Sequence, residues 1–187
     1  MANRTQIVCL HEGRKGRSVD SVFINRLVRS LKPVWIRPWG SNTIRLESCG
    51  GRTDLIREMP RQLKQVLAAG SDTTLMVWAD LDHDMADGNQ LKDRFWKEAQ
   101  QNGITRTDFD QVVFAFAKDR IENWVEFLMK GTTDESTEGP RLNDDLQAAE
   151  AARRLADHCR RGAPIPNLPP SLAWSCENWR NLATRMR

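Results

Sequence analysis

The stretch TTLMVWADLD, residues 73–82, decides how this sequence folds. Its first seven residues, Thr73 to Ala79, are mostly apolar, which is typical of a strand buried on both faces of a parallel sheet. Asp80 and Asp82 follow at once, so the strand should end at a polar edge of the sheet. A buried strand that runs directly into closely spaced acids is the central feature of this chain.

Other strand and helix patterns alternate around this stretch. Short apolar runs predict strands at Gln6–Leu10, at Val112–Ala117 and, more weakly, at 34–36 and 44–46. Between the strands, apolar residues recur every three or four positions, and the expected helices cover 19–31, 54–67, 89–101 and 121–130. Pro60 is expected to kink or break the second helix. This alternation predicts an α/β fold, with a mostly parallel, Rossmann-like sheet and helices on both faces.

The composition changes after residue 130. Residues 131–140 are polar and acidic and indicate a linker, and residues 143–161 form an Ala-rich helical pattern. Residues 164–170 contain four prolines and are expected to be extended, before a short helix over 176–185. We therefore expect a catalytic domain over 1–130 and a helical C-terminal extension with its linker over 131–187.

The bulk properties restrict the class of protein. The 187 residues include 28 Lys and Arg against 25 Asp and Glu, and a formal charge of +3 permits a nucleic-acid partner without requiring one. The N-terminus has no apolar signal region, and no stretch approaches the ~20 apolar residues of a membrane span. The four cysteines show no C-x-x-C spacing. These features predict a cytoplasmic protein without a membrane partner.

Acidic residues follow two of the predicted strands. Glu12 comes directly after the first strand, while Asp80, Asp82 and Asp84 come after the third. Functional groups of parallel sheets gather at the carboxyl ends of the strands, so these side chains are expected to meet. Converging carboxylates repel one another, and Mg²⁺ or Mn²⁺ relieves that repulsion. We expect a divalent-metal site here.

Three other acidic motifs can be compared with the same residues. An EF-hand beginning at Asp80 would need Gly and Glu where the chain has Met85 and Leu91, so it is excluded. A haloacid-dehalogenase phosphatase would carry D-x-D-x-T on its first strand, whereas this motif lies in mid-chain with Asp84 in place of Thr. A manganese-dependent nucleotide-sugar glycosyltransferase stays open, although it does not explain Glu12-Gly13.

A strand ending in Glu12-Gly13 and a later strand ending in Asp80-Leu81-Asp82 resemble the Toprim domain over about residues 5 to 130. Ala79-Asp80-Leu81-Asp82 together with Ile121-Glu122-Asn123-Trp124 is similar to small stand-alone Toprim-like proteins of bacterial defence and mobile elements, and to OLD-type nucleases. The resemblance covers the first part of the chain only. The residues beyond about 131 match no family that we can name.

The resemblance implies roles for individual residues. It makes Glu12, Asp80 and Asp82 the metal-binding and catalytic acids, and Glu122 a candidate fourth acid. Gly13 matches the glycine that lets the backbone turn beside the metal. OLD-type nucleases carry a further acid four residues after the first Glu. This chain has Gly16 there, and Asp20 is the nearest substitute.

Basic residues flank the predicted acids. Arg14, Lys15 and Arg17 follow Gly13 in a loop that would suit a phosphodiester, and Arg52 precedes a helix N-terminus that would attract an anion. Lys118, at the end of the fourth strand, is a candidate electrostatic helper. His11 is expected to face away from Glu12 because side chains alternate along a strand.

These features predict a Mg²⁺- or Mn²⁺-dependent nuclease that acts on DNA in preference to RNA, and the resemblance implies that it belongs to an anti-phage or mobile-element system. The resemblance implies an ATPase or another defence subunit as partner, and leaves room for a homo-oligomer. The alternative is a non-catalytic subunit that binds nucleic acid or a nucleotide. The sequence contains no tyrosine, so a topoisomerase with a tyrosine nucleophile is excluded within this chain.

Overall fold

A computed structural model of the protein describes residues 7–13, 16, 18–31, 44–70, 73–142, 144–161 and 165–185. Its centre is a sheet of four strands: β1 (Ile7–His11), β2 (Ile44–Ser48), β3 (Thr74–Leu81) and β4 (Val113–Lys118). The strands are all parallel and run in the order β2-β1-β3-β4. The predicted α/β fold with a parallel sheet is confirmed.

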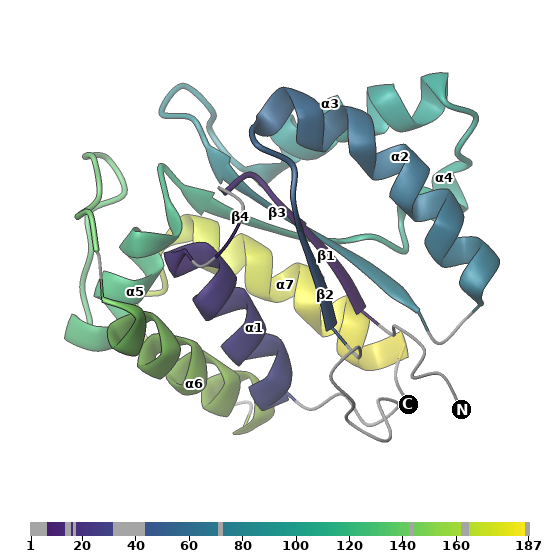
Figure 1. Ribbon diagram of the computed structural model, residues 1–187. Helices are drawn as coiled ribbons and strands as arrows, with labels where there is room; N and C mark the ends of the chain where they lie inside the picture. Colours follow the sequence, from purple (N-terminus) through teal and green to yellow (C-terminus); the bar gives the residue numbers. More distant parts are fainter. Residues whose placement is uncertain are drawn as a thin grey trace.

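Helices cover both faces of this sheet (Figure 1). On one side lie α1 (Val19–Leu31), α5 (Ile121–Lys130) and α6 (Asp145–Arg161), and on the other lie α2 (Arg52–Ala69), α3 (Gly88–Gln101) and the short α4 (Arg106–Phe109). Successive side chains of each strand point to opposite faces of the sheet and pack into two separate hydrophobic cores. Ile7 and Cys9 face the α1 side, while Val8 and Leu10 face the α2 side.

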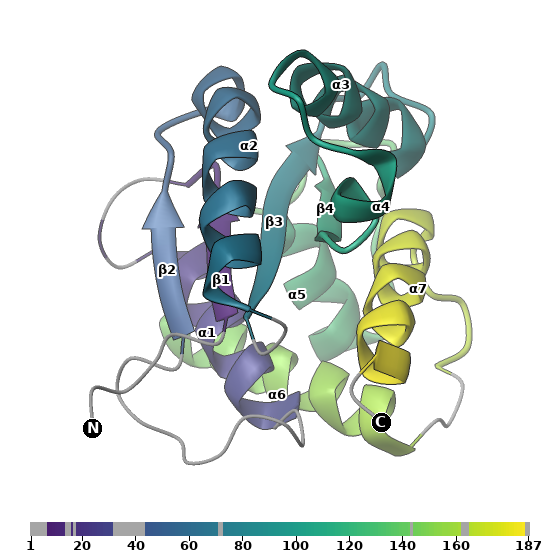
Figure 2. The ribbon, with the colours of Figure 1, turned by 90° about the vertical axis from the view of Figure 1, so that its right-hand side faces the viewer.

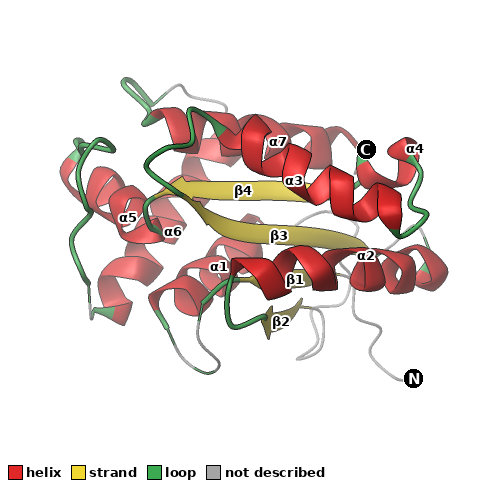
Figure 3. Cartoon of the chain, turned by 90° about the horizontal axis from the view of Figure 1, so that it is seen from above, coloured by secondary structure: helices red, strands yellow, loops and turns green. Residues whose placement is uncertain are grey.

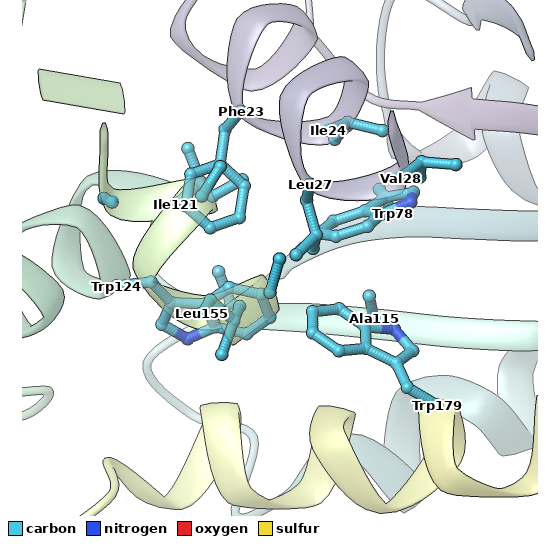
Figure 4. Close-up of a cluster of buried hydrophobic side chains, with 14 of the residues drawn as sticks. Phe23, Ile24, Leu27, Val28, Trp78, Ala115, Ile121, Trp124, Leu155 and Trp179 are labelled. Atoms are coloured by element: carbon cyan, nitrogen blue, oxygen red, sulfur yellow. The ribbon is translucent and has the colours of Figure 1, made fainter. Parts of the chain in front are cut away.

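The core on the α1 side is rich in aromatic rings (Figure 4). Trp78 from β3 lies with its ring centroid 6.4 Å from that of Phe23, 6.2 Å from that of Trp124 and 5.4 Å from that of Trp179. Trp179 belongs to α7 (Pro170–Arg185), so the C-terminal part of the chain contributes to the same core as the strands. This packing fixes the face of the sheet from which Asp80, two residues after Trp78, projects.

Helix α7 runs alongside β4, the last strand of the sheet (Figures 2 and 3). Ser175 Oγ accepts a hydrogen bond from Phe116 N at 3.0 Å and donates one to Phe116 O at 3.3 Å, and Ser171 Oγ accepts from Lys118 N at 3.2 Å. An exposed edge strand can pair with other chains, and a helix that covers the edge prevents this pairing. Helix α7, in the C-terminal extension, therefore covers the β4 edge of the sheet.

Several element boundaries differ from those expected. Helix α2 continues through Pro60, so no break occurs, because Leu55, Met59, Leu63 and Val66 hold one face of the helix on the core. Helix α7 begins at Pro170, six residues earlier than predicted, since proline is well tolerated in the first turn of a helix. The strand expected at 34–36 lies outside the described residues.

The segment 131–140, predicted to be a linker, is held by hydrogen bonds. Gly139 N donates to the Asp119 carboxylate at 2.9 Å, and Arg120 pairs with Glu138 at 2.7 Å. Glu135 accepts a hydrogen bond from Ser171 N at 3.1 Å, at the start of α7. None of the described helices is both long enough and apolar enough to cross a lipid bilayer.

Candidate functional site

The predicted acids gather at the carboxyl ends of β1 and β3. The register pairs His11 with Trp78, two residues before Asp80, and Glu12 follows His11 directly. A cavity of about 200 Å³ opens there, and its polar lining comes from His11, Glu12, Asp20 and Asp80. Asp80 lies within β3, one residue before its end, so the sheet itself fixes the position of this carboxyl group.

The charged groups that influence Asp80 are mainly other acids. Burial raises the pKa of its carboxyl group well above the ordinary value, and the nearby charges of Asp20, Glu12 and Glu122 raise it further. Only Arg52 acts in the opposite direction among the causes of this shift. A carboxyl group placed among like charges at a strand end has a strong affinity for a cation or a proton.

Two further acids belong to this cluster, and each comes from the first turn of a helix. Asp20 lies at the start of α1 and Glu122 at the start of α5, and burial is the main cause that raises the pKa of both. Ser18 caps α1, since its Oγ accepts from Ser21 N at 3.2 Å. Asp20 is therefore not needed as the cap, and it faces Asp80 and His11.

Arg52 lies among the acids, whereas the sequence analysis assigned it to a phosphate. Its Nε donates to Glu12 Oε1 at 2.6 Å, its Nη1 pairs with Asp82, and its Nη2 donates to the Asp80 carbonyl oxygen at 2.6 Å. Arg52 is the first residue of α2, directly after Gly51. Its guanidinium group neutralises part of the negative charge that the acids bring together.

The loop after β3 carries the other predicted residues. Asp82 and Asp84 are exposed, and Asp82 reaches the cluster through Arg52. Lys118 Nζ donates to the carbonyl oxygens of Asp82 at 2.9 Å, His83 at 3.0 Å and Met85 at 2.6 Å. In this arrangement Lys118 holds the loop that presents Asp82.

His11 and Gly13 behave differently from the expectation. His11 was predicted to face away from Glu12, yet both residues line the cavity, because the strand ends at His11 and the chain turns immediately after it. Burial lowers the pKa of His11, and the charge of Asp20 partly opposes this effect. A Cβ on Gly13 would lie 2.8 Å from Asp20 Oδ2 and 2.9 Å from His11 Nδ1, so glycine keeps this space open.

Sequence patterns indicate only part of this site. Strand ends identify Glu12 and Asp80, whereas Asp20 stands out only as a substitute for a missing acid. Strict alternation hides His11, because it does not hold past the end of the strand. Arg14, Lys15 and Arg17, predicted to bind phosphate, lie outside the described residues.

Within the residues that the structure describes, no group of three or more His, Cys, Asp or Glu side chains is already arranged to hold a metal ion. The Arg52 ion pairs account for part of this, since they direct Glu12 and Asp82 toward the guanidinium group. No protein-family model, no curated protein and no solved structure matches the chain.

Proposed function

We propose that this chain is a metal-dependent nuclease that cleaves phosphodiester bonds at the cavity between β1 and β3. The observation that carries the proposal is the environment of Asp80, which shares a cavity with Glu12 and Asp20 and lies within the electrostatic influence of Glu122. Folding such a group without a ligand costs free energy, because like charges are brought together in a partly dry site. A divalent cation would remove that cost.

The residues present fit Mg²⁺ or Mn²⁺, since carboxylate oxygens are the ligands that both ions accept. Glu12, Asp80 and Asp82 would hold the ion, with Asp20 and Glu122 completing the negative field around it, and Asp84 at the rim. A bound divalent ion would activate water and stabilise the leaving oxygen of a phosphodiester. The likeness of the Glu12-Gly13 and Asp80-Leu81-Asp82 motifs to Toprim domains supports the same reaction.

The chain's own residues have separate tasks in this proposal. Arg52, once released from Glu12 and Asp82, is placed to contact a phosphate oxygen, for which the fork of its guanidinium group is suited. Lys118 positions the Asp82 loop through three carbonyl groups. Arg14, Lys15 and Arg17 follow Gly13 in the sequence and would contact the nucleic-acid backbone.

A nuclease assay on two matched variants tests the proposal. Labelled single- and double-stranded DNA and RNA are incubated with the parent protein, Asp80→Asn and Asp93→Asn, in Mg²⁺ or Mn²⁺. Asp93 is exposed on α3, so its variant makes the same chemical change away from the cavity. We expect the parent and Asp93→Asn to cleave, preferring DNA, and Asp80→Asn to lose at least about a hundredfold in rate.

The alternative is a non-catalytic subunit that binds nucleic acid or a nucleotide. The Arg52 ion pairs favour it, because they neutralise two of the acids without any metal. Binding without cleavage by all three proteins, also in the presence of an ATPase subunit of the same defence system, would establish the alternative. Equal cleavage by the parent and Asp80→Asn would show that the active site lies elsewhere.

A further inference from the structure

His11 carries a buried nitrogen that lacks a partner. The residue is only 4% exposed, and its Nδ1 has no hydrogen-bond partner in the described part of the chain. Leaving a buried polar atom unpaired costs about 1–3 kcal/mol, so most such atoms in folded proteins have a partner. A buried imidazole nitrogen in this state indicates a ligand that completes the site.

The unpaired nitrogen faces the acidic cavity. A Cβ on Gly13 would lie 2.9 Å from His11 Nδ1 and 2.8 Å from Asp20 Oδ2, so both atoms border the same small space. Gly13 is not among the glycines with positive φ, and its lack of a side chain therefore matters for the space. Glu12 and Asp80 line the same cavity.

We propose that this cavity is a mixed nitrogen and oxygen site for a divalent transition-metal ion, with His11 Nδ1, Asp20 and Asp80 among its ligands. The inference rests on the proposed function, since it names the ion that would serve the same reaction. Mg²⁺ strongly prefers oxygen ligands, whereas the affinity of a site with an imidazole nitrogen rises along the first-row transition metals from Mn²⁺ onward. The working ion is therefore a first-row transition-metal ion, for which Mn²⁺ serves as the spectroscopic probe, and Mg²⁺ binds more weakly.

The presence of a histidine nitrogen on the metal can be measured directly. Mn²⁺ is added to the full-length, tag-free protein, and its electron spin echo modulation is recorded with natural-abundance and with ¹⁵N-labelled histidine. The chain has three histidines, His11, His83 and His158. The His83→Gln/His158→Gln double variant leaves His11 as the only histidine. We expect this variant to retain a nitrogen coupling that changes on ¹⁵N labelling.

His11→Gln supplies the complementary measurement. We expect it to lose the coupling and to weaken Mn²⁺ binding by about tenfold, with a smaller effect on Mg²⁺ binding. If His11→Gln does not fold, the double variant alone decides the question.

The possible failures are distinguishable. Bound Mn²⁺ without a histidine coupling, or a coupling that disappears in the double variant, overturns this inference and leaves the proposed function standing. No Mn²⁺ binding to the parent overturns this inference, and if Mg²⁺ also fails to bind or to support cleavage, the proposed function falls with it.

Discussion

The carboxyl ends of β3 and β4 lie side by side in the sheet, yet their acidic residues meet opposite surroundings. At the end of β3, the like charges of Asp20, Glu12 and Glu122 act on Asp80 and raise the pKa of its carboxyl group. Just after β4, the Asp119 carboxylate accepts hydrogen bonds from Arg120 Nε and from Gly139 N, both at 2.9 Å. It also lies 3.5 Å from His83 Nε2.

The contrast separates two kinds of acid. Asp119 is held by donors, so its charge contributes to the stability of the loop after β4, where it adopts a left-handed backbone with φ of 61°. Asp80 faces like charges, so its charge opposes folding until a cation or a proton arrives. A buried acid close to like charges indicates a binding site more reliably than the mere presence of acidic residues.

Asparagine at the two positions should shift stability in opposite directions. Asp119→Asn loses a charge-assisted bond and should lower the free energy of unfolding by about 1–3 kcal/mol. Asp80→Asn removes a repelled charge and should raise it in metal-free protein at pH 7. Because the pKa of Asp80 is raised in the folded state, this gain should fade as the pH falls toward and below its ordinary value.

Urea unfolding of the two variants and the parent, in chelator at pH 7 and at pH 4, checks both signs. If Asp80→Asn were as destabilised as Asp119→Asn at pH 7, Asp80 would have a favourable partner and the contrast between the two strand ends would be wrong.

The sequence predicted more of the fold than of the site. Apolar runs such as Thr73–Ala79 located the strands and, with them, Asp80, because burial on both faces leaves a continuous signal in the sequence. Asp20 and Arg52 reach the acids from helices whose positions relative to the strands depend on packing. Ser171 and Ser175 gave no signal at all, since nothing in a serine's neighbours reveals that it will cover the edge of a distant strand.

Ser171 fixes the end of β4. Its Oγ accepts from Lys118 N at 3.2 Å and from Trp124 Nε1 at 2.7 Å. Ser171→Ala would leave both donors without their partner, and we expect the free energy of unfolding to fall by about 2 kcal/mol. Ser136→Ala, an exposed change in the segment 131–140, should cost far less in the same urea titration. Equal costs would show that the tail does not hold β4.

Arg52 already places a positive charge at the carboxyl end of β3, where it pairs with Glu12 and Asp82. Arg52→Gln should raise the affinity for Mn²⁺ by about tenfold, because Glu12 and Asp82 lose a competing charge. The same variant should cleave nucleic acid more slowly if Arg52 contacts the phosphate.

Arg61→Gln is the matched control for this prediction. Arg61 also belongs to α2 and also pairs with a carboxylate, that of Glu58, but it lies away from the cavity. Its variant should bind Mn²⁺ as the parent does in calorimetric titrations. A fall in affinity for Arg52→Gln alone would mean that Arg52 orders the acids for the metal instead of competing with it.

Gly13 offers the finest test, because its side chain would enter the space between Asp20 and His11. Gly13→Ala should weaken Mn²⁺ binding by roughly threefold to tenfold, while the free energy of unfolding falls by about 1–3 kcal/mol, since the Asp20 carboxylate and the buried His11 ring must both shift.

Gly103→Ala should cost a similar amount of stability for the opposite reason. Gly103 has a left-handed backbone with φ of 73°, and nothing described lies within 4 Å of the added Cβ. Its variant should leave Mn²⁺ affinity unchanged. Equal Mn²⁺ affinities of the two variants would place the ion away from Gly13. A loss of Mn²⁺ affinity in Gly13→Ala alone would locate the ion in the cavity lined by His11, Asp20 and Asp80.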